Sequence, residues 1–225
     1  MQRIFDIILS ASAILVLSIL LVPIMIVLKF TGEGEIFFLQ ERIGRFGKPF
    51  KLMKFATMLK NSPNVGTGTV TVKSDPRVLP VGKFLRSSKI NELPQLLNIL
   101  IGDMSVIGPR PLTHQTFSAY SVDVQKSIAQ IRPGLSGIGS IIFRNEEEIL
   151  SGDDSSMQFY KDVIAPYKGS LEDWYVNNNN ISIYIKSIFV TAFAVFRPDT
   201  RIAWNIFPDL PTPPVQLRSK LNYLW

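Results

Sequence analysis

Two arginines of this 225-residue chain are adjacent to prolines in a way that favours phosphate binding. Arg110 lies between Pro109 and Pro111, and Arg132 precedes Pro133. Each proline fixes its own φ angle, and it also restricts the residue before it to extended backbone conformations. A guanidinium group on such a stiff segment can bind a phosphate through two parallel hydrogen bonds. The sequence therefore predicts a polyphosphate site, whose candidate cations are Lys54, Arg86, Arg110, Arg132 and Arg144.

A second candidate stretch, residues 88–100, follows Arg86 in the chain. Its leucines recur at helical spacing, which predicts a helix that starts near Asn91. Asn91 suits the N-cap position, and Glu92 in the first turn is favoured by the positive end of the helix dipole. One interpretation is a purely structural helix cap. The other is an anion-binding helix N-terminus that Arg86 completes.

The composition excludes several other chemistries. The chain has no cysteine, which excludes disulfides, thiolate metal sites and cysteine nucleophiles. His114 is the only histidine, so metal sites that need two are excluded, and we assign His114 no chemistry. Residues 1–112 carry a net charge of +7, which favours an anionic leaflet or phosphate ligands. Because these basic residues are not interleaved with aromatic ones, we expect no nucleic-acid partner.

An uncharged stretch of 22 residues, 7–28, precedes these motifs. As a straight helix it would measure roughly 33 Å, enough to cross a hydrocarbon layer of about 30 Å. Pro23 lies inside it and lacks an N–H group, so we expect a kink or a break between Ser18 and Pro23. Two topologies are open here: a kinked single-pass anchor, and a re-entrant helix that breaks and returns. The positive charges follow the stretch, which places the body of the protein on the cytoplasmic side.

The rest of the chain predicts an α+β fold, a small mixed and mainly helical domain with short strands. Residues 37–42 and 50–55 are expected to be the strands, joined by a glycine-containing connection at 44–48. A second apolar stretch, Ile181–Phe196, is interrupted by Lys186 and is too short to span a bilayer comfortably. We expect it to lie in the membrane interface or to pack on the domain.

Taken in order, these pieces resemble the bacterial sugar transferase family, the monotopic phosphoglycosyl transferases that start membrane-linked glycan assembly. The resemblance covers nearly the whole chain, and it depends on the order and spacing of several segments. These are residues 3–6 (RIFD), 54–58 (KFATM), 82–86 (GKFLR), 91–96 (NELPQL), 102–112 (GDMSVIGPRPL), 132–134 (RPG) and 173–176 (DWYV).

The resemblance implies a reaction. A phospho-sugar passes from a nucleotide diphosphate-sugar, by resemblance a UDP-sugar, to polyprenol (undecaprenyl) phosphate, and the nucleoside monophosphate is released. It implies Mg²⁺ as cofactor with Glu92 as its ligand, and catalytic positions at residues 91 and 92. The candidate cations are then assigned to the donor or acceptor phosphates.

The resemblance also implies a topology. It favours the re-entrant arrangement, with residues 1–30 as the membrane helix and Pro23 at the break, although Val22 occupies a position where the family often has serine. Residues 31–225 then form a cytoplasmic transferase domain with an interfacial C-terminal helix at about 181–196. This places the protein at the cytoplasmic face of a bacterial inner membrane, in contact with membrane lipids. Homo-oligomer formation stays open.

One position departs from the family pattern. The family has an Asp-Glu pair whose Asp is the covalent nucleophile, whereas this chain has Asn91 and Glu92. A carboxamide is a poor nucleophile, so a phosphoryl-enzyme at residue 91 is excluded. Four explanations are open: a natural branch that uses direct attack by polyprenol phosphate, Glu92 as nucleophile, an engineered variant, or lost activity. In the last case the function would be that of a membrane-bound ligand-binding or scaffold protein with the same fold.

Overall fold

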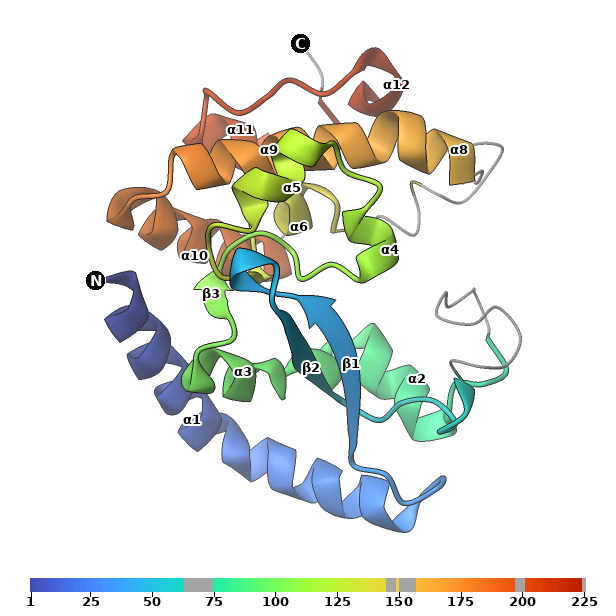
Figure 1. Cartoon of the computed structure of the whole chain (residues 1–225). Coiled ribbons are helices and arrows are strands. Elements are labelled where there is room, and N and C mark those ends of the chain that lie inside the picture. The colour runs from blue at the N-terminus through green and yellow to red at the C-terminus, as the bar shows by residue number, and fades with distance from the viewer. Residues whose placement is uncertain (63–74, 145–148, 150–156, 197–200, 224–225) are drawn as a thin grey trace. The chain divides into compact units, whose positions relative to one another are not determined.

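The structure is a computed structural model that describes residues 1–62, 75–144, 149, 157–196 and 201–223 (Figure 1). The chain divides into two compact units, and each is described by itself. We call Ile7–Glu41 with Lys51–Ile101 the N-terminal unit. We call Met1–Asp6, Arg42–Phe50 and Gly102–Trp225 together the C-terminal unit.

Helices dominate the described chain, as the sequence predicts. The α-helices are α1 (Gln2–Phe30), α2 (Pro80–Ser87), α3 (Gln95–Ile101), α4 (His114–Phe117), α5 (Val122–Ile128), α6 (Ile138–Ile142), α8 (Met157–Phe159), α9 (Ala165–Asn177), α10 (Ile181–Phe196), α11 (Arg201–Ile206) and α12 (Val215–Arg218). The strands are β1 (Phe37–Ile43), β2 (Pro49–Phe55), β3 (Ser105–Ile107) and β4 (Gly134–Ser136). Two 3₁₀ turns, η1 (Arg45–Gly47) and η3 (Ile90–Glu92), and one π turn, η4 (Tyr160–Ile164), complete the elements.

α1 is the one helix of the described residues that is long and apolar enough to cross a membrane. It has 29 residues, and large apolar side chains such as Leu15 and Ile19 are exposed along it, as expected for a surface that faces lipid. Pro23 lies inside α1, which Figure 1 draws as one continuous coil. The predicted break between Ser18 and Pro23 is therefore not confirmed, because a proline removes one hydrogen bond and the helix continues on both sides. The re-entrant path stays a prediction.

In the N-terminal unit, α1, β2 and α2 share a small core centred on Leu28, Phe55 and Leu85. β1 and β2 pair as a two-stranded sheet, which confirms both predicted strands. The connection between them contains Phe46 at φ 60° and Gly47 at φ 71°, the left-handed backbone that a tight turn requires.

Buried Asn98 fixes β2 to α3 within this unit. Its Nδ2 donates to Lys51 O at 2.8 Å, and its Oδ1 accepts from Met53 N at 2.9 Å. Both ends of the carboxamide are therefore satisfied by one strand, as a buried polar group requires. The helix that follows residues 91 and 92 is thereby held against β2, the strand that carries Lys54.

In the C-terminal unit, β3 and β4 pair in parallel, with Ser105 opposite Gly134 and Ile107 opposite Ser136. Helices surround this pair, and α9 packs against both α5 and α6. The core of the unit contains fully buried side chains from several helices, among them Ile138, Leu171, Tyr175 and Tyr184.

Asp6 is a buried structural anchor in the same unit. Its side chain is 2% exposed, and its Oδ1 accepts hydrogen bonds from Tyr184 OH at 2.8 Å, Ser105 Oγ at 2.8 Å and Val106 N at 2.9 Å. A buried carboxylate is expensive unless donors surround it, and here three converge on one oxygen. The start of α1 is thereby tied to α10 and β3.

Candidate functional site

The segment around residues 91 and 92 differs from its prediction. Asn91 is not the N-cap of a helix: it lies inside η3, and α3 begins only at Gln95. The bonds from Leu93 N to Ile90 O and from Leu96 N to Leu93 O span three residues, as in a 3₁₀ turn. The chain thus enters α3 through a 3₁₀ turn, with Pro94 directly before the first residue of the helix. The predicted N-cap is therefore wrong, while the interpretation of these residues as an anion-binding site stays a prediction.

Instead, this turn places the Glu92 carboxylate beside Lys54 of β2. Glu92 Oε1 lies 3.5 Å from Lys54 Nζ, with side-chain exposures of 29% and 20%. Asn91 is 7% exposed, and its Oδ1 is buried and has no hydrogen-bond partner among the described residues. A buried acceptor without a partner is uncommon in a protein and is costly unless a ligand or water satisfies it.

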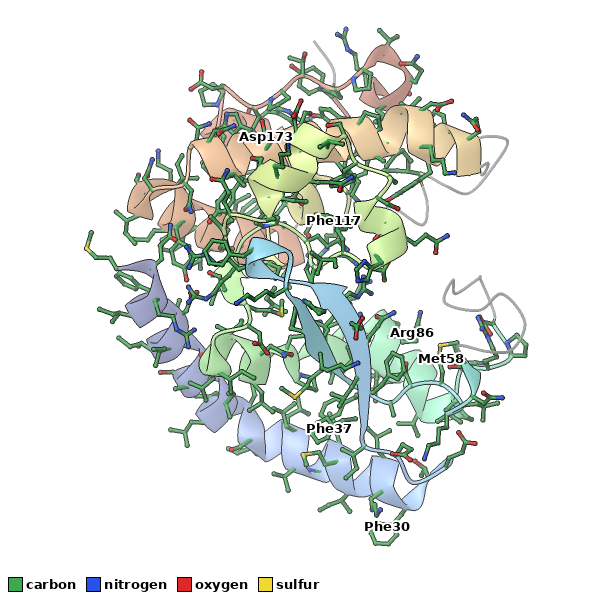
Figure 2. All side chains as sticks on the ribbon, in the orientation of Figure 1. Phe30, Phe37, Met58, Arg86, Phe117 and Asp173 are labelled. Carbon is green, nitrogen blue, oxygen red and sulfur yellow. The ribbon has the colours of Figure 1, made fainter. Side chains whose placement is uncertain are left out.

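Arg86 belongs to the same unit and lies in the last turn of α2, just before η3. Its Nη1 lies 3.8 Å from Met58 Sδ, and Figure 2 shows the two side chains next to each other. The packing of Gly82 supports this placement, because a Cβ there would lie only 2.2 Å from Thr57 O. α2 therefore lies tight against the chain after β2, and Lys54, Arg86, Asn91 and Glu92 all belong to the N-terminal unit.

The other candidate arginines belong to the C-terminal unit. Arg110 is exposed, and its backbone N–H donates to Glu172 Oε1 at 3.4 Å. Arg132 is partly buried, and its Nε donates to Gly102 O at 2.8 Å. Arg144 is exposed just after α6. The seven predicted site residues therefore divide between the units, four in the N-terminal unit and three in the C-terminal unit.

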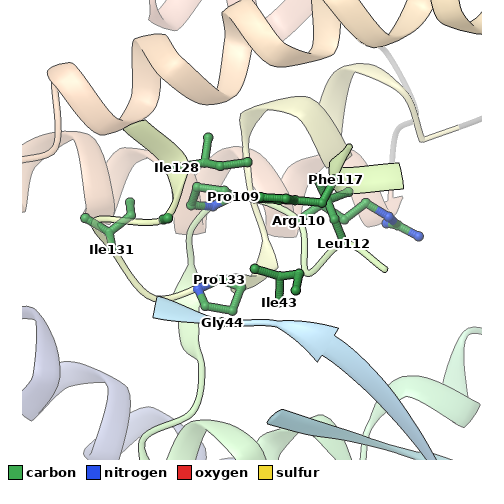
Figure 3. Close-up of a pocket in the computed structure, with 10 residues that line it drawn as sticks. Ile43, Gly44, Pro109, Arg110, Leu112, Phe117, Ile128, Ile131 and Pro133 are labelled. Carbon is green, nitrogen blue, oxygen red and sulfur yellow. The ribbon is translucent and has the colours of Figure 1, made fainter. Parts of the chain in front are cut away.

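A small, largely apolar pocket lies beside Arg110 in this unit. Pro109, Pro133 and Ile128 are among its walls (Figure 3). In Figure 3 the Arg110 side chain extends away from these residues, and its guanidinium group lies beyond the pocket. The apolar lining holds the backbone of the arginine, while the charged end is free to meet a ligand in solution or at a surface.

Backbone hydrogen bonds join the two arginine–proline segments. Gly134 N donates to Pro109 O at 2.8 Å, and Gly108 N donates to Ser136 O at 2.9 Å. A Cβ on Gly134 would lie 2.1 Å from Gly108 N, so no larger residue fits there. The backbone that carries these two arginines is therefore constrained, as the sequence predicts. The constraint depends on glycine as well as on proline.

Sequence reasoning missed Glu172 in α9. This carboxyl is 1% exposed, its Oε2 has no partner in the described structure, and Lys168 is buried one turn earlier. Burial raises the pKa of Glu172 to about 7, while the bond from Arg110 N and the charges of Lys168 and Arg110 oppose the rise. The signal in the sequence was weak, since a glutamate beside an aspartate on a helix is usually exposed.

No cluster of three or more Asp, Glu, His or Cys side chains suited to a metal occurs among the described residues. An ion that arrives with a phosphate ligand has different needs, because Mg²⁺ in phosphate-binding enzymes commonly uses one or two protein oxygens and completes its shell with phosphate and water.

Comparison with known proteins supports the resemblance found in the sequence. The family model described as bacterial sugar transferase matches residues 1–198. The exopolysaccharide production protein ExoY of Sinorhizobium fredii is 36% identical over 159 residues, which cover 64% of this chain and 70% of that protein. The UDP-glucose:undecaprenyl-phosphate glucose-1-phosphate transferase of Klebsiella pneumoniae is 34% identical over 200 residues, 87% of this chain and 40% of that protein.

A third relative is the undecaprenyl-phosphate galactose phosphotransferase of Salmonella typhimurium, 32% identical over 216 residues, 88% of this chain and 41% of that protein. The chain thus spans less than half the length of the Klebsiella and Salmonella relatives. The family match includes the apolar helix, the turn with Asn91 and Glu92, and both arginine–proline segments. The chain belongs to the bacterial sugar transferase family.

Proposed function

We propose that this protein transfers a phospho-sugar from a UDP-sugar to undecaprenyl phosphate, as the first membrane step of glycan or exopolysaccharide assembly. The observation that carries the proposal is the pairing of Lys54 with Glu92 in the compact unit that also contains Arg86 and residues 7–30 of the apolar helix. Charged groups suited to phosphate thus belong to the unit that can contact a membrane. The printed names of the Klebsiella and Salmonella relatives supply the substrate class.

The chemistry is a displacement at phosphorus. An oxygen of undecaprenyl phosphate attacks the phosphorus that carries the sugar, and a new P–O bond forms. The P–O bond that joins the two donor phosphates breaks, and UMP leaves with the bridging oxygen. Such reactions depend on positioning and on neutralising charge, which is the work of cations such as Lys54 and Arg86. We assign Arg110, Arg132 and Arg144 to the same task from their sequence motifs.

The oxygens present in the N-terminal unit fit a magnesium ion that is shared with a diphosphate. Glu92 would hold it through its carboxylate, and the unpartnered Oδ1 of buried Asn91 offers a second oxygen. When bound, the ion would supply neutralisation of phosphate charge. Lys54 fits the same function, because its ammonium group already offsets the charge of Glu92.

Asn91 decides the mechanism that we propose. A carboxamide cannot form the phosphoryl-enzyme that an aspartate would form. Glu92 is engaged with Lys54, which makes it a better ligand and charge partner than a nucleophile. We therefore infer direct attack by the acceptor phosphate, with donor and acceptor bound at the same time. Covalent labelling of Glu92 by the donor would overturn this inference.

The membrane placement follows from exposed apolar surface. Besides α1, helix α10 presents Phe189 at 69% exposure and Phe193 at 40%, which suits burial at a lipid interface. We propose that the protein lies at the cytoplasmic face of the bacterial inner membrane, where positive residues follow the apolar stretch. We keep the re-entrant path of α1 as part of this proposal.

A second candidate function is favoured by one observation, the carboxamide at position 91. A protein with this fold that binds UDP-sugar or undecaprenyl phosphate without turnover would serve as a membrane-bound scaffold. Retention of Glu92 together with the three arginine segments weighs against it. Binding without turnover across a broad donor panel, with none restored by Asn91→Asp, would favour it.

The test is transfer of labelled sugar into lipid. Purified protein in lipid nanodiscs that contain undecaprenyl phosphate would receive Mg²⁺ and a panel of radiolabelled UDP-sugars. We expect one donor to yield labelled undecaprenyl diphosphate-sugar, and we expect Glu92→Gln and Arg110→Ala each to reduce the rate by at least a hundredfold. His114→Gln, on exposed α4, is the control and should retain the rate. Unchanged turnover in both site variants would refute the assignment of the site.

A further inference from the structure

Glu172 is the buried carboxyl that the proposed chemistry does not use. It lies on the inner face of α9, is 1% exposed, and has an Oε2 without a partner in the described chain. Burying an incompletely bonded carboxyl costs stability, because it loses hydration that nothing fully replaces. A simple apolar residue would serve the core of α9 better. The contacts of the carboxyl must therefore explain why a glutamate occupies this position.

Its contacts come from two other segments of the C-terminal unit. Oε1 accepts the backbone N–H of Arg110 at 3.4 Å. A Cβ on Gly139 would lie 2.5 Å from the same Oε1, and one on Gly137 would lie 3.7 Å from Oε2. The glycines at the start of α6 thus leave the room in which the carboxyl reaches the arginine segment.

Backbone hydrogen bonds to the β4 segment fix the two residues that precede Arg110. Gly108 N donates to Ser136 O, and Gly134 N donates to Pro109 O, so Arg110 follows directly after two anchored residues. Arg110 is exposed and its guanidinium points away from the pocket (Figure 3). Its own backbone N–H is bonded to Glu172. Between Pro109 and Pro111, this N–H is the only backbone donor, because prolines have none.

The charges around Glu172 agree with this role. Arg110 faces it from the loop, and Lys168 and Tyr175 belong to its own helix. Residues 134–143, which form β4 and α6, contain no charged side chain. β4 and α6 therefore offer no acidic group to the Arg110 segment, and the carboxyl that bonds to its backbone is that of Glu172.

We propose that Glu172 is a positioning residue that fixes the backbone of Arg110, and through it the direction of the guanidinium group toward a phosphate of the substrate. The link to substrate phosphate depends on the proposed function. The link between Glu172 and the Arg110 backbone does not. Both can be measured on the full-length protein in lipid nanodiscs.

Three variants separate the roles of the side chain. Glu172→Gln keeps an oxygen for the Arg110 N–H, and Glu172→Met keeps the length but offers no oxygen. Asp162→Asn removes an exposed carboxylate from η4, where Asp162 Oδ2 accepts from Gln158 Nε2, and it is the matched control. A merely structural role predicts that Glu172→Met is harmless, because it fills the same space without a buried carboxyl.

The first readout is amide hydrogen exchange of residues 106–112, with α5 of the same unit as reference. We expect Glu172→Met to speed exchange in 106–112 roughly tenfold, while Glu172→Gln and Asp162→Asn stay close to the parent. Exchange in α5 should not change. Equal exchange of 106–112 in Glu172→Met and the parent protein would overturn the proposal.

Glu172→Asp serves as a second variant in case Glu172→Met does not fold. It keeps the charge but draws the carboxyl back by one methylene, away from the Arg110 N–H. We expect faster exchange of 106–112 in this variant too, and parent-like exchange would equally overturn the proposal.

The second readout is kinetic. For the UDP-sugar that the parent protein uses, Glu172→Met should raise KM roughly tenfold and change kcat less than threefold, with the parent value restored in Glu172→Gln. A parent-like KM in Glu172→Met would refute the link to substrate. If the parent protein turns over no donor, the proposed function fails, while the exchange measurement still decides the contact between Glu172 and Arg110.

Discussion

Replacing Glu172 by glutamine should change how the stability of the protein depends on pH. The side chain is 1% exposed, and burial raises its pKa from 4.5 to about 7. Because the folded state binds the proton more tightly than the unfolded state, this group stabilises the fold at low pH, and the contribution is lost as the pH rises from about 4.5 to about 7. Moving the pKa by that amount corresponds to about 3 kcal/mol.

Between pH 5 and pH 8 the parent protein should lose about 2–3 kcal/mol of this contribution, and Glu172→Gln should lose none of it. For a chain of this size the difference corresponds to roughly 5–10 °C in Tm. The assay is thermal unfolding in nanodiscs at pH 5 and pH 8, with the change in Tm compared between the two proteins. Asp162→Asn, with its exposed carboxyl, should follow the parent curve. Parallel pH curves for the parent and Glu172→Gln would refute the argument from burial.

The remaining predictions concern the anchor, the glycines and the membrane. Asp6→Ala should destabilise the protein by about 3 kcal/mol, because three buried donors lose their acceptor, and chemical denaturation measures this. Gly134→Ala should cost at least about 2 kcal/mol, since its Cβ would meet Gly108 N, and it should also raise KM for the donor; a parent-like Tm would contradict this. Single cysteines at positions 2 and 60 should both react with an impermeant thiol reagent only from the cytoplasmic side, whereas periplasmic labelling at position 2 would exclude the re-entrant path.

Local sequence signals predicted much of the fold. The apolar runs gave α1 and α10, and the strands at 37–42 and 50–55 match β1 and β2 to within one residue at each end. These features depend on neighbouring residues alone. The helix start near Asn91 was wrong, because residues 90–92 form a 3₁₀ turn and α3 begins only at Gln95.

The sequence predicted candidate site residues only where the residue type and its motif indicate a chemical role. Lys54 and Glu92, nearly forty positions apart, form an ion pair that the sequence order does not reveal. Glu172 was missed because its burial depends on glycines more than thirty positions away at the start of α6. Asp6 likewise becomes an anchor only when Tyr184 folds back on it. Contacts of this kind come from packing, which periodicity and motifs do not encode.

The central claim is that this chain, with asparagine at position 91, is a working transferase. The most direct measurement is release of UMP from a panel of UDP-sugars by the parent protein and by Asn91→Asp, with Mg²⁺, in the presence and absence of undecaprenyl phosphate. Direct attack predicts that the parent protein releases UMP from one donor only when undecaprenyl phosphate is present, with no burst before the acceptor is added. No release by the parent protein from any donor, with or without the acceptor, would contradict the account.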